Sequence, residues 1–326
     1  MMMWKIGEVE IANQIVVGPM AGISNSAFRL IAKEFGAGLC YSEMISDKAI
    51  CYGNKRTLAM VDVNKDEGLV ATQLFGNEIS SMVEAAKYLD KNTNCAFIDI
   101  NMGCPVPKVV NSGSGSALLK DPDLAFALVK AISKEIKKPL TVKMRIGWDL
   151  NNIVGKEFAL GLQKAGAAAL VVHGRVRSQY YEGQADWEVI KSIKEALSIP
   201  VIGNGDINSG EKAKDCLAYS GCDAVMLARG VLGNPWLIKE AVAVLDSKET
   251  PQSISVDEKF KVAKDHALRL IALKGERLAM KEMRGHACWY IHGLPYNNQV
   301  KALFNRMTSY QQFDTILDDY KNRLGE

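Results

Sequence analysis

The chain has 326 residues, of which 48% are hydrophobic and 24% charged. This is ample for a large buried core, and it is too long for one ordinary domain unless that domain is an α/β barrel. The seven cysteines are an odd number without a C-x-x-C pair, and no Cys/His cluster has zinc-ligand spacing. These features indicate neither a disulfide framework nor a metal site, and they favour the reducing cytoplasm.

The N-terminus has no apolar signal core, and no stretch of the chain approaches 18 uninterrupted apolar residues. We therefore expect a soluble protein that is neither exported nor inserted in a membrane. The formal net charge of +3 argues neither for nor against a polyanionic partner until it is divided by region.

Short apolar runs alternate with amphipathic stretches from residue 15 to about residue 240. Each run is bounded by polar residues or by Gly and Pro, as buried strands are. The eight runs cover residues 15–18, 39–41, 69–74, 97–100, 140–144, 169–173, 201–203 and 224–227. Eight strands alternating with helices predict an α/β fold, a parallel (β/α)8 TIM barrel, with an open doubly wound sheet as the alternative.

The stretches between these runs have helical periodicity. In the clearest of them, Asp121 caps a helix that has Pro122 in its first turn. The apolar face of this helix carries Leu124, Leu128, Ile132 and Ile136. Residues 187–197 and 209–219 behave similarly. We assign residues 1–245 to the barrel domain.

A linker at residues 247–253 ends the strand pattern, and helical spacing takes over. We predict an all-helical domain over residues 246–326. Its apolar positions include Phe260, Ala263, Ala267, Leu270, Ile271, Val300, Leu303, Phe304 and Met307. No repeat or low-complexity tract indicates a solenoid or a disordered tail.

The helical domain contains a basic segment, which we define as residues 259–306. Its cations are Lys259, Lys261, Lys264, Arg269, Lys274, Arg277, Lys281, Arg284, Lys301 and Arg306. Its acids are Asp265, Glu276 and Glu282. A solvated helical face explains any single lysine, but the collective excess of positive charge favours a polyanionic partner.

Active sites of β/α barrels are built from the loops at the C-terminal ends of the strands. The residues that end or follow the predicted strands form a coherent set of candidates. They include Pro19, Met20, Ala21, Gln73, Asn101, Cys104, Lys143, Arg145, His173, Arg175, Asn204, Gly205, Asp206, Ala228 and Arg229.

The segments 204–206 and 228–230 follow the seventh and eighth strands, where barrels commonly bind a phosphate with backbone N–H groups. Glycine allows close approach of the backbone, and Arg229 supplies a charged fork. The alternative is that Gly-Asn-Gly-Asp is only a strand-to-helix turn. In this context we predict a cofactor that carries a phosphate.

Lys143 and His173 lie on nearby strands that are otherwise apolar. A cation there is costly unless it is paired or serves an anionic ligand. A structural ion pair is the alternative for Lys143, and a satisfied core histidine is the alternative for His173. The two residues together favour a site.

Cys104 follows a predicted strand in the motif Asn101-Met102-Gly103-Cys104-Pro105. The flanking Gly and Pro leave little local side chain to pack, which indicates a backbone shaped to present the sulfur. Inert packing is the alternative, and we accept it for Cys40, Cys95, Cys216, Cys222 and Cys288.

No H-E-x-x-H, G-x-S-x-G or G-x-x-x-x-G-K-[ST] motif competes with this site. The segment 112–115, Ser-Gly-Ser-Gly, looks like a phosphate cradle but lacks the following Lys-Ser/Thr pair. We interpret it as a mobile lid beside Cys104.

With these residues in order, the chain resembles the tRNA-dihydrouridine synthase family over almost its whole length. The resemblance is carried by Pro19-Met20-Ala21-Gly22-Ile23, Gln73-Leu74-Phe75-Gly76, Asn101-Met102-Gly103-Cys104-Pro105, Val142-Lys143-Met144-Arg145, His173-Gly174-Arg175, Gly203-Asn204-Gly205-Asp206-Ile207 and Gly233-Asn234-Pro235-Trp236. Seven motifs in family order are specific, although each is weak alone. Trp289-Tyr290, Gly293-Leu294-Pro295 and Asn305-Arg306 are similar to the bacterial B-type branch.

The resemblance implies an FMN-containing barrel that reduces the C5=C6 bond of selected tRNA uridines and uses NADPH to recharge the flavin. The implied partner is tRNA, and we expect a monomer. FMN would lie among Pro19, Met20, Ala21, Gln73, Lys143, His173, Asn204, Gly205, Asp206, Ala228 and Arg229. Cys104 would be the general acid that protonates C5, and Asn101, Arg145 and Arg175 would contact the substrate.

The chain departs from the family pattern at two places. Ser24-Asn25 stands where Thr-Asp is usual, and Val176 replaces a common Thr. We expect both near the rim of the site, with an effect on substrate preference rather than catalysis. Rival functions are an FMN barrel acting on a free pyrimidine or an enone, and an RNA-binding protein without catalysis. The modified tRNA position and the preference between NADPH and NADH are not predicted by the sequence.

Overall fold

Eight parallel strands form a closed barrel in the computed structural model, which describes residues 3–250 and 253–325. The barrel strands are β3 (Ile15–Val17), β4 (Leu39–Ser46), β5 (Val70–Phe75), β6 (Phe97–Met102), β7 (Leu140–Gly147), β8 (Ala169–Val176), β9 (Val201–Asn204) and β10 (Ala224–Leu227). They pair in chain order, and β10 closes on β3. The (β/α)8 fold is confirmed, and the open-sheet alternative is wrong.

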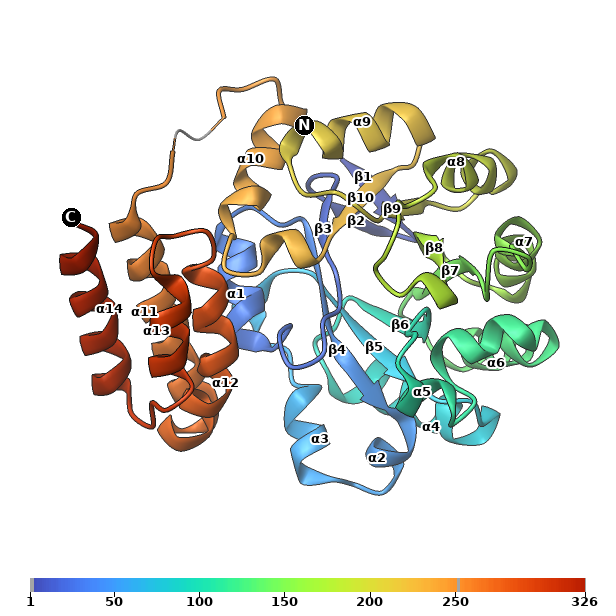
Figure 1. Cartoon of the computed structure of the whole chain (residues 1–326). Coiled ribbons are helices and arrows are strands. Elements are labelled where there is room, and N and C mark those ends of the chain that lie inside the picture. Colours follow the sequence, from blue (N-terminus) through green and yellow to red (C-terminus); the bar gives the residue numbers. More distant parts are fainter. Residues whose placement is uncertain (1–2, 251–252, 326) are drawn as a thin grey trace.

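Helices surround the barrel (Figure 1). They are α1 (Ser26–Glu34), α2 (Asp47–Cys51), α3 (Lys55–Met60), α4 (Ile79–Asn92), α5 (Pro107–Val110), α6 (Pro122–Glu135), α7 (Gly155–Ala165), α8 (Trp187–Ala196), α9 (Gly210–Ser220) and α10 (Trp236–Leu245). Short 3-10 turns are η1 (Lys65–Glu67), η2 (Gly115–Lys120), η3 (Arg177–Gln179) and η4 (Arg229–Val231). The predicted cap of α6 is confirmed, because Asp121 accepts a hydrogen bond from the Leu124 N–H.

A short hairpin of β1 (Trp4–Ile6) and β2 (Val9–Ile11) precedes the barrel. Its apolar side chains pack with Leu39, Phe97 and Ala169, the first residues of three barrel strands. The hairpin therefore plugs the N-terminal end of the barrel and leaves the opposite end for a site. The sequence analysis predicted no strand before residue 15, because three-residue strands give too short an alternating pattern.

Four further helices complete the chain and lie beside α1 (Figure 1). They are α11 (Val256–Lys274), α12 (Glu276–Tyr290), α13 (Asn297–Phe304) and α14 (Tyr310–Leu324). Their shared core buries Phe260, Leu270 and Phe304, as predicted, whereas Leu303 is half exposed and the expectation for it was wrong.

These helices touch the barrel through Ala27 of α1, which joins their core, and through an ion pair between Arg269 and Glu34. The division at residue 245 stays a prediction. Residues 251–252 of the predicted linker and the first two residues of the N-terminus lie outside the described residues. Among the described residues, no helix is long and apolar enough to cross a bilayer.

Candidate active site

A cavity of about 680 Å³ opens at the C-terminal ends of the barrel strands. Its lining includes every residue that the sequence analysis proposed for the site, from Pro19 to Arg229. Met44, Tyr181 and Met226 also line it and were missed. A second cavity of about 640 Å³ lies between α1, α10 and α11, and none of the residues predicted for the active site lines it.

Cys104 lies in the loop that leaves β6 and is held there by Asn101. The Cys104 and Gly103 N–H groups donate to Asn101 Oδ1 at 2.8 and 3.1 Å. Burial raises the pKa of the Cys104 thiol, while a backbone hydrogen bond and the nearby cations Arg145 and Lys143 oppose that shift. The sulfur is therefore a protonated thiol at neutral pH, as a general acid requires.

The segment 112–115 lies beside Cys104 but is packed rather than open. Ser114 and Ser116 are buried, and the Ser116 N–H donates to the Cys104 carbonyl oxygen at 3.1 Å. Gly115 has a φ of +62°, and a Cβ there would meet the same carbonyl. This geometry packs the end of the segment against the Cys104 loop, whereas Ser112 is exposed, and the lid stays a prediction.

A buried carboxylate lies beneath the same loop. Asp99 accepts hydrogen bonds from Gln73 Nε2 at 2.7 Å and from Thr141 Oγ1 at 2.6 Å. Burial raises its pKa to about 7, and those two hydrogen bonds and Lys143 oppose the shift. The sequence analysis missed Asp99 because it lies inside a strand that was treated as uniformly apolar.

Lys143 projects from β7 into the cavity, where its ammonium donates to Asn204 Oδ1 at 3.0 Å. Within the described part of the chain it forms no ion pair, which argues against the structural alternative. Burial, followed by repulsion from Arg145, lowers the pKa of Lys143 to about 8. An anion bound beside the Lys143 ammonium would stabilise its charged form.

His173 and Arg175 lie two residues apart on β8. Burial and the surrounding cations hold the pKa of His173 well below its usual range, so its ring is neutral. Arg175 is 2% exposed, and its guanidinium binds both oxygens of Asp206 at 2.6 and 2.9 Å. This geometry favours a positioning role for Arg175 over the direct substrate contact that we predicted.

Arg145 ties two loops of the site together. It donates to the carbonyl oxygens of Gly103 and Tyr180 at 3.0 and 2.7 Å. Tyr181 follows Tyr180 in the chain. Its ring lies over the Arg229 guanidinium, with 4.4 Å between the ring centroid and Arg229 Cζ. Tyr181 carries no motif signal, since only the loop geometry brings it to the cavity.

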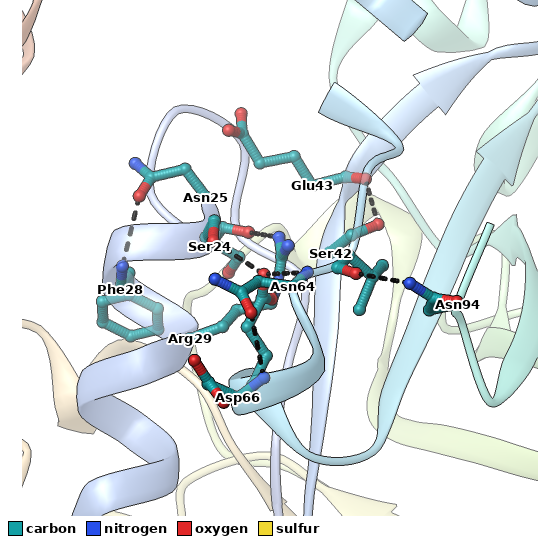
Figure 2. Close-up of polar contacts among 12 residues, drawn as sticks. Ser24, Asn25, Phe28, Arg29, Ser42, Glu43, Asn64, Asp66 and Asn94 are labelled. Atoms are coloured by element: carbon teal, nitrogen blue, oxygen red, sulfur yellow. Dashed lines mark hydrogen bonds and ion pairs between the residues drawn. The ribbon is translucent and has the colours of Figure 1, made fainter. Parts of the chain in front are cut away.

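The loop from β3 to α1, which carries Pro19, Met20 and Ala21, is fixed by polar contacts. The Met20 N–H donates to Ser24 Oγ at 3.0 Å, and Ser24 Oγ donates to the Gly18 carbonyl oxygen at 3.1 Å. Figure 2 shows Asn25 capping α1 by accepting from the Phe28 N–H.

Ser24, Asn25 and Val176 are buried where β3 and β8 lead into the loops at the open end of the barrel, and their effect on substrate preference stays a prediction. Ser24 holds the loop through its hydroxyl, and Asn25 acts through its cap. Val176 acts through its backbone, because its carbonyl oxygen accepts from Arg145 Nη1 at 2.8 Å.

The basic segment is partly neutralised in the fold. Lys264 pairs with Asp314 and Asp318 of α14, Arg269 with Glu34 and Asp265, and Lys274 with Glu282. Within the described basic segment, the exposed cations in no ion pair are Lys261, Arg277, Lys281 and Arg306. The residues described include no cluster of three or more His, Cys, Asp or Glu that could hold a metal ion.

Comparison with known proteins gives a consistent result. A family model described as dihydrouridine synthase matches residues 15–324. A Rickettsia bellii protein named "Probable tRNA-dihydrouridine synthase" is 39% identical over 306 residues, which cover 94% of each chain. Proteins named tRNA-dihydrouridine synthase B are 36% identical in Pasteurella multocida, over 98% of this chain and 96% of the relative, and 34% identical in Shewanella oneidensis, over 98% and 99%.

Proposed function

Because this chain belongs to the dihydrouridine synthase family, whose members act on uridines of tRNA, we propose that it reduces the C5=C6 bond of selected tRNA uridines, with FMN as the flavin and NADPH as the reductant. One observation carries the proposal. The protonated Cys104 thiol shares a single cavity with the half-buried Lys143 ammonium at the open end of the barrel.

The donor set of the cavity fits an anionic flavin cofactor. Lys143 and Arg229 face it as cations, and the carboxylate of Asp206 is already bound by Arg175. We propose that Pro19, Met20, Ala21 and Gln73 surround the ring system, with Lys143 and His173 at its polar edge. Asn204, Gly205, Asp206, Ala228 and Arg229 would surround the phosphate, Asp206 through its backbone.

When bound, FMN would supply a hydride to C6 of the uracil ring. The chain's own residues then complete the reduction. Cys104 gives its proton to C5, where negative charge develops, and Lys143 supplies fixed positive charge in a site of low dielectric. The Asn101 oxygen already accepts from the Cys104 and Gly103 N–H groups, so Asn101 can offer the uracil an amide N–H, which would exchange its weak contact with the Met44 sulfur at 3.8 Å for a carbonyl oxygen.

A uridine in folded tRNA must leave its stack to enter the cavity, which costs a few kcal/mol. The unpaired cations Lys261, Arg277, Lys281 and Arg306 would supply compensating phosphate contacts. A barrel that reduces a free pyrimidine is the alternative function, but a small substrate needs no such surface.

The proposal is tested with purified protein, FMN, NADPH and tRNA from cells that lack this chain. Nucleoside mass spectrometry should show uridine converted to a product heavier by two hydrogens, with no such product from tRNA without enzyme. Free uridine and uracil are assayed in parallel. Reduction of the free base in place of tRNA would replace the proposal with the small-molecule alternative.

The lowered pKa of Lys143 predicts that the affinity for FMN depends on pH. Since its pKa is lowered to about 8, it is charged below that pH, and its attraction for an anion fades as pH rises above it. FMN affinity should therefore fall between pH 7 and pH 9.5, by about tenfold if one charge-assisted hydrogen bond is lost.

Fluorescence titration of the apoprotein with FMN measures this change. Lys143→Met should bind FMN weakly at pH 7 and show little further loss at pH 9.5. The control is Lys87→Met, which alters an exposed ion pair away from the cavity and should keep the pH dependence of the original chain. An unchanged affinity in Lys143→Met would contradict the assigned contact.

A further inference from the structure

A continuous line of hydrogen bonds runs along the inside of the barrel to the Cys104 loop. It begins at Asp99, which accepts from Gln73 Nε2 at 2.7 Å. Gln73 Oε1 accepts in turn from Asn101 Nδ2 at 2.8 Å. Asn101 Oδ1 accepts from the Cys104 and Gly103 N–H groups. Asp99 and Gln73 are fully buried, and Asn101 is nearly so.

The direction of this relay is set at both ends. The backbone N–H groups of Cys104 and Gly103 only donate, so Asn101 must present its oxygen to them and its NH2 group to Gln73. Gln73 then presents its NH2 group to Asp99, which above its pKa of about 7 is a carboxylate that only accepts. Reversal of either amide would place donor against donor inside the barrel, where unsatisfied groups are costly.

We propose that Asp99 is a positioning residue, which anchors the Gln73 and Asn101 amides and thereby holds the Cys104 loop and the Asn101 N–H that is offered to the substrate. The inference rests on the proposed function, since it concerns the same proton transfer. An N–H is complementary to a uracil carbonyl and not to an amino group. Asp99 thus influences which base is accepted without touching it.

Thr141 is the second side chain that donates to Asp99, through its hydroxyl to Oδ1 at 2.6 Å. In Thr141→Val, Asp99 still accepts from Gln73, and the relay keeps its anchor. In Asp99→Leu/Thr141→Val, position 99 offers no acceptor, so the buried Gln73 NH2 group is left unsatisfied, and Gln73 and Asn101 lose their fixed places beside the Cys104 loop.

The experiment compares these two variants by steady-state kinetics and by alkylation of Cys104. Since a displacement of about 1 Å in a reacting group can cost about 10²-fold, the double variant should lose about 30-fold or more in kcat relative to the single variant. The KM for tRNA should stay within about threefold, because phosphate contacts dominate affinity. Partial unfolding would also lower the apparent kcat at constant KM, so the alkylation of the buried Cys40 and Cys95 is the control for folding.

Alkylation by iodoacetamide, resolved by peptide mass spectrometry, needs neither tRNA nor cofactor. Cys104 should react faster in the double variant, while the buried Cys40 and Cys95 stay protected and report an intact fold. If they react, Asp99→Leu alone, close to Asp in size, replaces the double variant under the same criteria. Equal kcat or an equal Cys104 alkylation rate in the two variants would overturn the inference. If the unmodified chain forms no dihydrouridine, the proposed function fails, and the alkylation comparison still decides the relay.

Discussion

Cys104→Ala is expected to lower the rate of dihydrouridine formation by about 10²- to 10⁴-fold, the usual contribution of a positioned general acid. The thiol is the proton source because burial raises its pKa and keeps it protonated at neutral pH. FMN binding and tRNA binding should persist, since neither depends on that proton. The measurement is a single-turnover reaction of NADPH-reduced enzyme with tRNA, quenched at intervals and followed by nucleoside mass spectrometry.

Cys288→Ala is the matched control. Cys288 is also a half-buried free cysteine with a pKa raised by burial, but it lies on α12, outside the cavity lining. Its loss should leave the single-turnover rate unchanged. A Cys104→Ala variant that reacts within about threefold of the original chain would show that C5 takes its proton from another group, because a positioned acid contributes far more.

The barrel could be predicted from the sequence because a parallel strand that is buried on both faces consists of a run of apolar residues. The same signal fails where strands continue into the site. β4, β7 and β8 extend three to five residues past their predicted ends, since polar residues such as Arg145 and Arg175 lie on the strands while their side chains enter the cavity. At these positions the same residues belong to the strand and to the site, so a hydrophobicity pattern does not show where the strand ends.

The site residues were predictable as a set, because one topology rule places all strand ends together. Their individual contacts were not. No motif spacing indicates Asp99. The hydrogen bond between Arg175 and Asp206 depends on the backbone of the loop after β8. Charge was also overestimated, because the window 259–306 stopped before Asp314 and Asp318, which neutralise Lys264 across the helix packing.

Glu67→Gln is expected to lower the free energy of unfolding by about 3 kcal/mol, the lower end of the cost of breaking a buried ion pair. Glu67 and Arg29 have side chains that are 0% and 2% exposed, with 2.5 Å between Arg29 Nε and Glu67 Oε2. The other carboxylate oxygen accepts from Ser26 Oγ at 2.6 Å and from the Asn64 N–H at 2.9 Å. A carboxamide must point its NH2 group either at Arg29 or at the Asn64 N–H, so one donor always faces another.

Urea denaturation measures this loss, and Glu135→Gln is the control, because it makes the same change in the exposed pair with Lys87 and should leave the midpoint unchanged. The effect should also reach the site. Arg29 Nη1 donates to the Ser24 carbonyl oxygen at 2.7 Å, and Ser24 Oγ holds the Met20 loop. FMN affinity should therefore weaken in Glu67→Gln and not in Glu135→Gln. Equal midpoints for the two variants would mean that the buried pair adds no stability beyond its packing.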